Sequence, residues 1–314
     1  LFPAAQDQLD HRRAGDADCY DIRKNTMTKQ RVLVVGATGY LGKFIVKELK
    51  SQGYWVRALS RDNHKIESVK QYVDEVVLGE ATKSETINGL CKNIDIVFSS
   101  LGITKQKDGL SYMDVDYQAN RNVLDEALIE NVKTFMFISV FNSDKLRHLE
   151  IVKAKERFTQ DLKKADIEHI IIRPNGFFSD MTEFFNMANR GRIYLFGNGK
   201  YRGNPIHGAD LAEACVKWLN TNGGEFNIGG PEILTQNEIA SQAFDVLEKM
   251  PKITYIPLMV RNLIVKFARI FTSGNTYGSI EFFMTVLAMD MVAPTYGQRT
   301  IRQYFKEISE VCDA

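Results

Sequence analysis

The chain has 314 residues, of which 44% are hydrophobic and 25% are charged, so it can bury a sizeable globular core. Its formal net charge of +1 provides no overall attraction for nucleic acid or for an anionic membrane. The cysteines are far apart and lack metal-ligand spacing, which predicts reduced thiols in a reducing compartment, the cytoplasm, and no metal site.

The first 26 residues lack the apolar core of a signal peptide and contain more aspartates than a transit peptide usually has. We therefore expect residues 1–26 to be a disordered extension. No uninterrupted apolar run reaches the ~20 residues that a membrane-spanning helix needs. The sequence thus predicts no transmembrane segment.

Short apolar strands alternate with amphipathic helices through residues 31–140. This alternation is typical of a parallel sheet covered by helices on both faces. We therefore predict an α/β fold of the Rossmann type, with a doubly wound parallel sheet. The expected strands are 31–37, 55–61, 75–80, 95–102, 134–140 and 168–174.

The composition changes after Pro174, where the chain becomes richer in glycine, asparagine and aromatic residues. We expect residues 27–174 to form a nucleotide-binding lobe and residues 175–314 a smaller substrate lobe, some segments of which return to the main sheet. Within 175–314 the patterns predict a strand at 224–230, a helix with a capping box at 235–250 and a short helix at 300–308.

The stretch VLVVGATGYLG contains glycines in a GxxGxxG pattern between the first strand and the first helix. Glycines at this spacing permit a tight turn, close approach of a pyrophosphate and close packing of helix on strand. The helix N-terminus adds free N–H groups that attract phosphate. We predict a dinucleotide site formed by Gly36, Thr38, Gly39, Tyr40, Leu41 and Gly42.

The end of the second strand reads ALSRD and indicates which dinucleotide is preferred. Chains that prefer NAD usually have an acid here for the ribose 2′-hydroxyl, but this chain has Ser60 and Arg61. An arginine at this place can pair with a 2′-phosphate. The sequence therefore predicts NADP(H) in preference to NAD(H), with Asp62 as a cap of the following helix.

Several stretches together resemble the short-chain dehydrogenase/reductase superfamily, in its NmrA-like or NAD(P)H-binding branch. They are GATGYLG, ALSR, GEAT, SSLG, DYQANRNVLDEA, FISV, IIIRPNGFF and PIHGADLAEA, and they extend over residues 31–230. The resemblance implies further cofactor contacts after the third, fourth and sixth strands. These are Gly79, Glu80, Ser100, Leu101, Gly102 and Asn175.

Active members of this superfamily use a serine after the fifth strand and a Tyr-x-x-x-Lys motif for proton transfer. By resemblance Ser139 is the serine, and Lys153 best matches the lysine that also binds the nicotinamide ribose. Lys155 is the alternative in a shifted register. The tyrosine position holds Leu149, or Ile151 in the shifted register, so the usual proton donor is missing.

The missing tyrosine bears on the choice between activities. Reduction of an activated C=C bond can take its proton from water or from the lysine, whereas sugar epimerases and dehydratases depend more on the tyrosine. The sequence thus predicts an NADPH-dependent reductase of a small, hydrophobic unsaturated or carbonyl substrate. The alternative is a non-catalytic NADP(H)-binding redox sensor or assembly protein, and an epimerase or dehydratase is the least favoured.

Two further stretches have competing interpretations. His207 and Asp210 suggest a proton relay, but we expect Asp210 to cap the following helix and His207 to pack at a strand end. The apolar stretch 258–271 is typical of a helix that closes a hydrophobic pocket or, alternatively, of one that makes peripheral membrane contact. We expect a monomer or homodimer that binds a small molecule and no nucleic acid.

Overall fold

In the computed structural model, which describes residues 29–103, 109–271 and 274–313, the chain is built around a parallel sheet of seven strands. The strand order β3-β2-β1-β4-β5-β6-β9 reverses between β1 and β4, as in doubly wound nucleotide-binding folds. The predicted fold class is confirmed. The strands are β1 (Arg31–Val35), β2 (Trp55–Ser60), β3 (Glu75–Leu78), β4 (Ile96–Ser99), β5 (Thr134–Ile138), β6 (Glu168–Pro174) and β9 (Gly224–Ile228).

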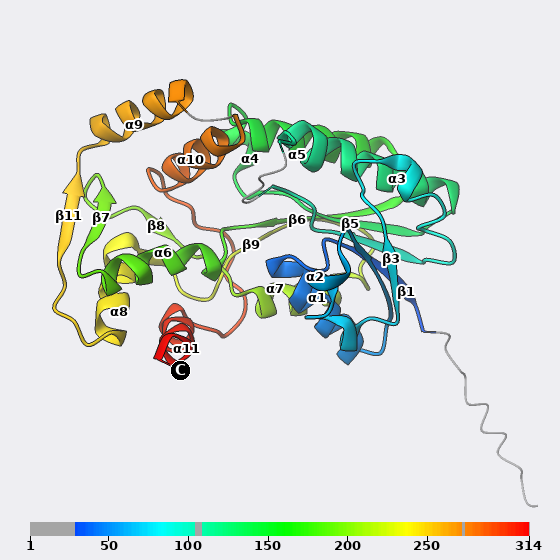
Figure 1. Cartoon of the computed structure of the whole chain (residues 1–314), viewed down its shortest axis with the longest axis horizontal. Coiled ribbons are helices and arrows are strands. Elements are labelled where there is room, and N and C mark those ends of the chain that lie inside the picture. Colours follow the sequence, from blue (N-terminus) through cyan, green and yellow to red (C-terminus); the bar gives the residue numbers. More distant parts are fainter. Residues whose placement is uncertain (1–28, 104–108, 272–273, 314) are drawn as a thin grey trace, which may run out of the picture.

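Helices cover both faces of this sheet (Figure 1). Helices α1 (Tyr40–Ser51) and α7 (Gly208–Trp218) pack together on one face, and α3 (Asn120–Ile129) and α5 (Glu150–Lys164) cover the other. Because successive strand side chains point to opposite faces and helices cover both faces, the central strands have apolar residues on both of their sides. This explains the uninterrupted apolar runs of the sequence.

Short helical segments connect the larger elements of this lobe. Asp62 caps α2 (Asn63–Ile66), since its Oδ1 accepts from the backbone N–H of His64 at 2.8 Å, as predicted. A π-helix (Met113–Ala119) runs directly into α3. The remaining segments are 3₁₀ turns at Lys70–Tyr72 and Ser84–Thr86, and the helix α4 (Ser143–Leu146).

The second lobe has a core rich in phenylalanine, formed by Phe184, Phe185, Phe244 and Phe305. Its helices are α6 (Phe178–Asn189), α8 (Gln236–Val246), α9 (Leu258–Phe271), α10 (Gly274–Val286) and α11 (Ile301–Asp313). Its strands form two small sheets, one from β7 (Ile193–Phe196) with β11 (Ile253–Ile256) and one from β8 (Arg202–Gly203) with β10 (Leu234–Thr235).

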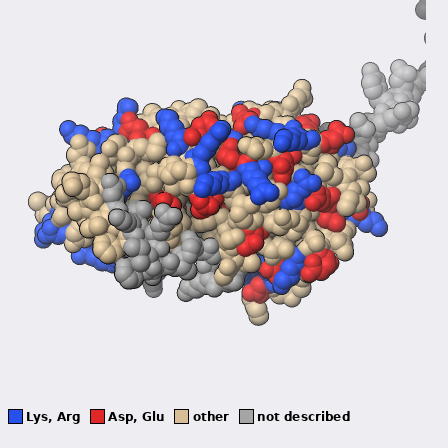
Figure 2. Space-filling model, turned by 90° about the horizontal axis from the view of Figure 1, so that it is seen from above, with Lys and Arg blue, Asp and Glu red and all other residues tan. Residues whose placement is uncertain are grey.

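Two segments that follow Pro174 lie with the first lobe in space. Strand β9 pairs with β6 from Ile170 to Pro174, and α7 packs against α1. The predicted capping box of α8 is present, because Thr235 and Glu238 each accept from the other's backbone N–H. Acidic and basic side chains are intermixed over α3 and α5, in keeping with the small net charge (Figure 2).

The start of α7 differs from the prediction. His207, not Asp210, is the N-cap, since its Nδ1 accepts from the backbone N–H of Ala209 at 3.1 Å. The buried Asp210 carboxylate instead accepts from the backbone N–H groups of Gln298 and Arg299, at 3.2 and 3.1 Å, and pairs with the Arg299 guanidinium. Asp210 therefore joins α7 to the chain that leads into α11.

The cap formed by His207 predicts a loss of stability in acid. Its burial, and then the nearby positive Arg299, hold the pKa of His207 below its usual value of 6.5. This contribution to folding is therefore present above pH 6.5 and is lost as the pH falls through the lower folded-state pKa. Urea unfolding at about pH 7.5 and about pH 5 should show a smaller loss for His207→Asn than for the parent, because asparagine caps without titrating. Equal losses would contradict this.

Candidate active site

Two adjoining cavities lie at the carboxyl ends of the central strands, where this fold class binds its ligands. The larger has a volume of about 330 Å³ and the smaller of about 200 Å³. Gly39, Ser100 and Gly102 line both. The two cavities therefore form one continuous site along the carboxyl edge of the sheet.

The glycine loop between β1 and α1 forms the centre of this site. Gly36 has φ of +91°, and a Cβ there would lie 2.7 Å from Ser100 Oγ, so only glycine fits. Gly39 is the N-cap of α1 and provides no side-chain acceptor, which leaves the first N–H groups of the helix for a ligand. A glycine-lined groove at an uncapped helix N-terminus fits a dinucleotide pyrophosphate.

The smaller cavity is formed by the loops after β1, β2, β3 and β4. The predicted cofactor residues that line it are Gly36, Thr38, Gly39, Ser60, Arg61, Gly79, Glu80, Ser100, Leu101 and Gly102. Arg61 is exposed at its edge. Glu80 is held by Lys83 at 2.7 Å and by Thr82 at 2.9 Å, and these hydrogen bonds lower the pKa of its carboxyl.

Gly39, Tyr40, Leu41, Ser100, Gly102, Ser139 and Asn175 line the larger cavity. Two other predicted residues line neither cavity. Gly42 packs α1 closely against the Gly36 carbonyl, which is the packing role expected of the third glycine. The second, Lys153, requires a correction.

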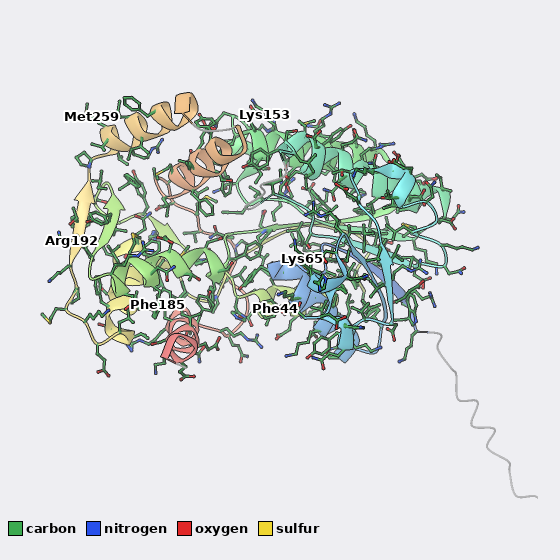
Figure 3. The ribbon with its side chains drawn as sticks, in the orientation of Figure 1. Phe44, Lys65, Lys153, Phe185, Arg192 and Met259 are labelled. Carbon is green, nitrogen blue, oxygen red and sulfur yellow. The ribbon has the colours of Figure 1, made fainter. Side chains whose placement is uncertain are left out.

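The prediction that Lys153 faces the site is wrong. Its side chain is 51% exposed and its Nζ lies 2.5 Å from Glu150 on the outer surface of α5 (Figure 3). Lys155, the alternative register, is buried and lines the larger cavity. Leu149 accordingly lies in the core as the N-cap residue of α5, and Ile151, one turn before Lys155, lines the cavity.

Lys155 is held by a buried partner that the sequence reasoning missed. Its Nζ lies 3.1 Å from Oδ1 of Asp116, which is fully buried in the π-helix. It also donates to the carbonyls of Ile138 at 3.2 Å and Leu101 at 3.4 Å. Burial raises the pKa of the Asp116 carboxyl, and Lys155 opposes that rise. The ammonium is therefore fixed between the ends of β4 and β5.

The π-helix is held in place by Asn120, the first residue of α3. Its side chain donates to the carbonyls of Val115 and Asp116, at 3.3 and 3.0 Å, and accepts from Ser99 Oγ at 2.5 Å. These bonds connect the Asn120 amide to two carbonyls of the π-helix and to the end of β4. Asn120 thereby sets the position of Asp116, and through it that of Lys155.

Ser139 lies at the cavity wall with its hydroxyl engaged elsewhere. Its Oγ donates to Glu156 at 3.1 Å and accepts from Arg173 at 3.2 Å. Arg173 also donates to Glu156 at 2.5 Å and to Ser143 at 2.9 Å. In this arrangement the Ser139 proton is directed to the buried Arg173–Glu156 pair, away from a substrate.

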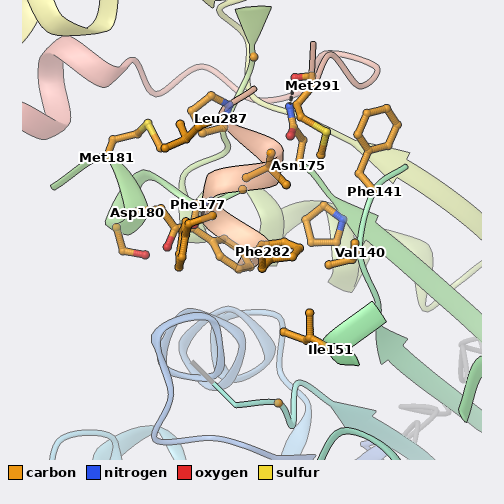
Figure 4. A pocket seen from close by; sticks show the side chains of 18 of the residues that line it. Val140, Phe141, Ile151, Asn175, Phe177, Asp180, Met181, Phe282, Leu287 and Met291 are labelled. Atoms are coloured by element: carbon orange, nitrogen blue, oxygen red, sulfur yellow. Dashed lines mark hydrogen bonds between the residues drawn. The ribbon is translucent and has the colours of Figure 1, made fainter. Parts of the chain in front are cut away.

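Asn175 lines the larger cavity, as expected of the loop after the sixth strand. Its side-chain amide donates to Asn204 at 2.8 Å and to the Met291 carbonyl at 2.5 Å (Figure 4). The side chain is buried, so these bonds fix its orientation. Asn175 thus joins the end of β6 to the segment that follows α10.

The wall of the larger cavity is mainly apolar. Figure 4 shows Ile151 and Phe282 among the apolar side chains that line it. Val140, Phe141, Leu287 and Met291 extend this surface. Tyr112, which the sequence reasoning also missed, adds a buried hydroxyl 3.0 Å from Ser279 Oγ, and burial raises its pKa. The site therefore combines one fixed ammonium with an apolar chamber.

Comparison with known proteins places this chain in a family. The model of the family described as NAD(P)H-binding matches residues 36–222, which is more than half of the chain. The chain belongs to this NAD(P)H-binding family. The sequence-based recognition is thereby confirmed at the level of the family.

Two curated proteins and one solved structure are similar to this chain. Divinyl chlorophyllide a 8-vinyl-reductase, chloroplastic, of Arabidopsis thaliana is 28% identical over 320 residues, which cover 88% of this chain and 76% of that protein. Photosystem II assembly factor Ycf39 of Guillardia theta is 28% identical over 194 residues, 61% of each chain. The structure of AtPrR2 with NADP+ and (+)pinoresinol has a TM-score of 0.71 at 19% identity, covering 89% of this chain and 98% of that one. Membership and relatives together support the prediction of an oxidoreductase.

The two lysines should differ sharply in what they contribute to stability. Lys155→Met leaves the Asp116 carboxylate buried without its partner, and we expect a loss of about 2–4 kcal/mol because protonation of Asp116 relieves part of the cost. Lys153→Met removes an exposed pair and should cost about 0–0.5 kcal/mol. Urea unfolding near neutral pH measures both. Similar losses for the two variants would contradict the assignment of Lys155 to the site.

Proposed function

We propose that the protein is an NADPH-dependent reductase that adds hydrogen across an activated C=C bond of a hydrophobic substrate. The observation that carries the proposal is the larger cavity, in which Lys155 stands beside an apolar wall and Ile151 occupies the position one turn before it. An apolar side chain there cannot serve as a proton donor. The arrangement suits reduction of carbon better than proton exchange with a sugar hydroxyl.

The residues of the smaller cavity are those that would hold the cofactor. The N-terminus of α1 with Gly36 and Gly39 would bind the pyrophosphate, and Arg61 would pair with the 2′-phosphate. Glu80 lies in the same groove, but its pair with Lys83 offsets the repulsion that its charge would exert on that phosphate. When bound, NADPH supplies the hydride.

The second hydrogen must reach the neighbouring carbon as a proton. Lys155 Nζ is a charged donor in the cavity wall, and we assign it that role, with solvent restoring the proton afterwards. Its positive charge also stabilises the negative charge that develops on an activated substrate, more strongly in an apolar cavity than in water. Tyr112 is a weaker candidate because burial raises its pKa.

The apolar residues that line the larger cavity indicate the class of substrate, and the name of one relative supports it. Side chains from α10 and the chain after it, such as Phe282, Leu287 and Met291, would contact an extended apolar or aromatic molecule. The relative from Arabidopsis thaliana is named as a vinyl reductase, and reduction of a vinyl group is the addition of hydrogen to a C=C bond. We propose the same type of reaction for this chain.

A second candidate function is an NADP(H)-binding assembly protein or sensor without turnover. The similarity to photosystem II assembly factor Ycf39 favours it. Such a protein would retain the glycine loop and Arg61, and it would bind NADPH without consuming it.

We also propose that the protein works in a reducing compartment, the cytoplasm, because Cys91 and Cys215 are buried free thiols.

The choice of dinucleotide can be tested at Arg61. Because Arg61 is exposed, Arg61→Ala should weaken NADPH binding by about 1–2 kcal/mol, or roughly 5–30-fold, and leave NADH binding nearly unchanged. Calorimetric titration with both dinucleotides measures this difference. Arg190→Ala, which removes an exposed arginine at the end of α6, is the control and should alter neither affinity. Equal affinity of the parent for NADPH and NADH would contradict the preference.

The proposed reaction is tested by NADPH consumption with a panel of enones, quinones and aldehydes, with enones expected as the best substrates. Lys155→Met should lower kcat by roughly 100-fold or more, in the range typical of a lost proton donor. Lys153→Met is the matched control and should retain the parent's kcat, and Tyr112→Phe should retain most of it.

Circular dichroism establishes that each variant is folded before its rate is compared. A folded Lys155→Met protein with the parent's kcat would refute the role of Lys155. Tight NADPH binding by the parent without turnover on any member of the panel would favour the assembly or sensor function.

A further inference from the structure

We propose that the outer face of helix α9 docks the protein on an anionic lipid bilayer. This face is exposed and apolar to a degree that is unusual for a surface helix. Met259 is 82% exposed, Leu263 53% and Phe267 52%, and Val260 and Ile264 are also exposed. Met259, Leu263 and Phe267 are spaced by four positions, as are Val260 and Ile264, so the two rows together form one stripe along the helix.

The charge of α9 favours an anionic surface. Its sequence, LMVRNLIVKFARIF, contains three basic residues and no aspartate or glutamate, although the whole chain is almost neutral. A helix with exposed large apolar side chains and only positive charges has the composition of helices that lie in the headgroup region of a membrane. Each basic residue near an anionic leaflet adds attraction.

The position of α9 makes this contact sterically possible. It lies at one end of the molecule and packs on α10, with Met259 at its outer side (Figures 1 and 3). Among the residues coloured in Figure 2, charged side chains gather over the end that carries α3 and α5, whereas the end that carries α9 is mainly tan. No helix in the described part of the chain is long and apolar enough to cross a bilayer, so α9 would lie along the surface.

A second copy of the chain fits this face less well than a bilayer. A two-fold contact centred on α9 would bring together two helices whose sequences each contain three basic residues and no acid to neutralise them. Anionic headgroups supply the opposite charge, and the acyl chains below them accommodate side chains such as Met259 and Leu263. The bilayer is therefore the occupant that satisfies both properties of the helix.

Docking here would bring the larger cavity close to the membrane. Phe283 of α10 lines that cavity and is itself an exposed apolar residue, and α10 is the helix on which α9 packs. A lipophilic substrate dissolved in the bilayer would then reach the cavity past Phe283 without crossing bulk water. This second step rests on the proposed reductase function, whereas the docking itself does not.

Flotation of the full chain with vesicles tests the docking. The parent should float with phosphatidylcholine vesicles that contain about 30% phosphatidylglycerol, and less with phosphatidylcholine alone, and added salt should weaken it. The double variant Met259→Glu/Leu263→Glu should lose at least ~10-fold in partitioning, because two anchoring side chains become acidic. Met250→Glu is the matched control, since Met250 is 81% exposed but lies outside α9, and it should bind like the parent.

The results separate docking from activity. The double variant should retain the parent's NADPH oxidation with a water-soluble enone, because neither residue lines the cavity. Failure of the parent to bind anionic vesicles, or equal binding by the double variant, would overturn the proposal. Light scattering that shows a dimer in the parent and a monomer in the double variant would assign the face to a second copy. Vesicle binding by a protein that reduces no member of the substrate panel would support the docking and contradict the reductase function.

Discussion

The ion pair between Lys155 and Asp116 fixes the geometry on which the rest of the site depends. One ammonium connects α5, the π-helix and the carbonyls of Leu101 and Ile138 that follow β4 and end β5. Two charges are removed from water only at a cost of several kcal/mol each, which their pairing must offset. Such a pair is a poor means of stabilising a fold but a good means of holding a charge at one place. Its position at the mouth of the strands is consistent with a chemical role.

The apolar surroundings of Lys155 determine what that charge can do. Ile151 lies one turn before it and Phe282 lines the same cavity, and Lys155 itself is buried, so little solvent screens the ammonium from a bound molecule. Asp116 balances the charge before any substrate enters, although burial raises the pKa of its carboxyl and Lys155 opposes that rise. A neutral, hydrophobic substrate suits these mainly apolar walls better than a charged sugar nucleotide, whose phosphates and hydroxyls would lie against apolar side chains over much of the cavity.

Local patterns were sufficient to predict the seven sheet strands and the glycine loop, because buried parallel strands and the phosphate turn each constrain consecutive residues. The choice of Lys153 over Lys155 was wrong because the motif spacing alone does not show which of the two lysines lies on the buried face of the helix. Val152, Lys155 and Phe158 share the buried face of α5, and that spacing would have excluded Lys153. The same reasoning, applied to the buried positions 116, 120 and 123, would have identified Asp116. No local pattern predicts the hydrogen bond between Asn175 and Met291, because the two residues are 116 positions apart in the sequence.

That distant contact explains how the two lobes share one cavity. Asn204 is fully buried, accepts from Asn175 and from the Ala293 backbone N–H, and donates to the carbonyls of Gly230 and Ala293. Every hydrogen-bonding position of this amide is used, which fixes the chain after α10 against the end of β6. The part of the cavity that Asn175 lines is thereby attached to the sheet. Its far wall comes from α10, which is far in sequence from the residues that hold Lys155, so under the proposed function substrate contacts and the position of the ammonium come from separate parts of the chain.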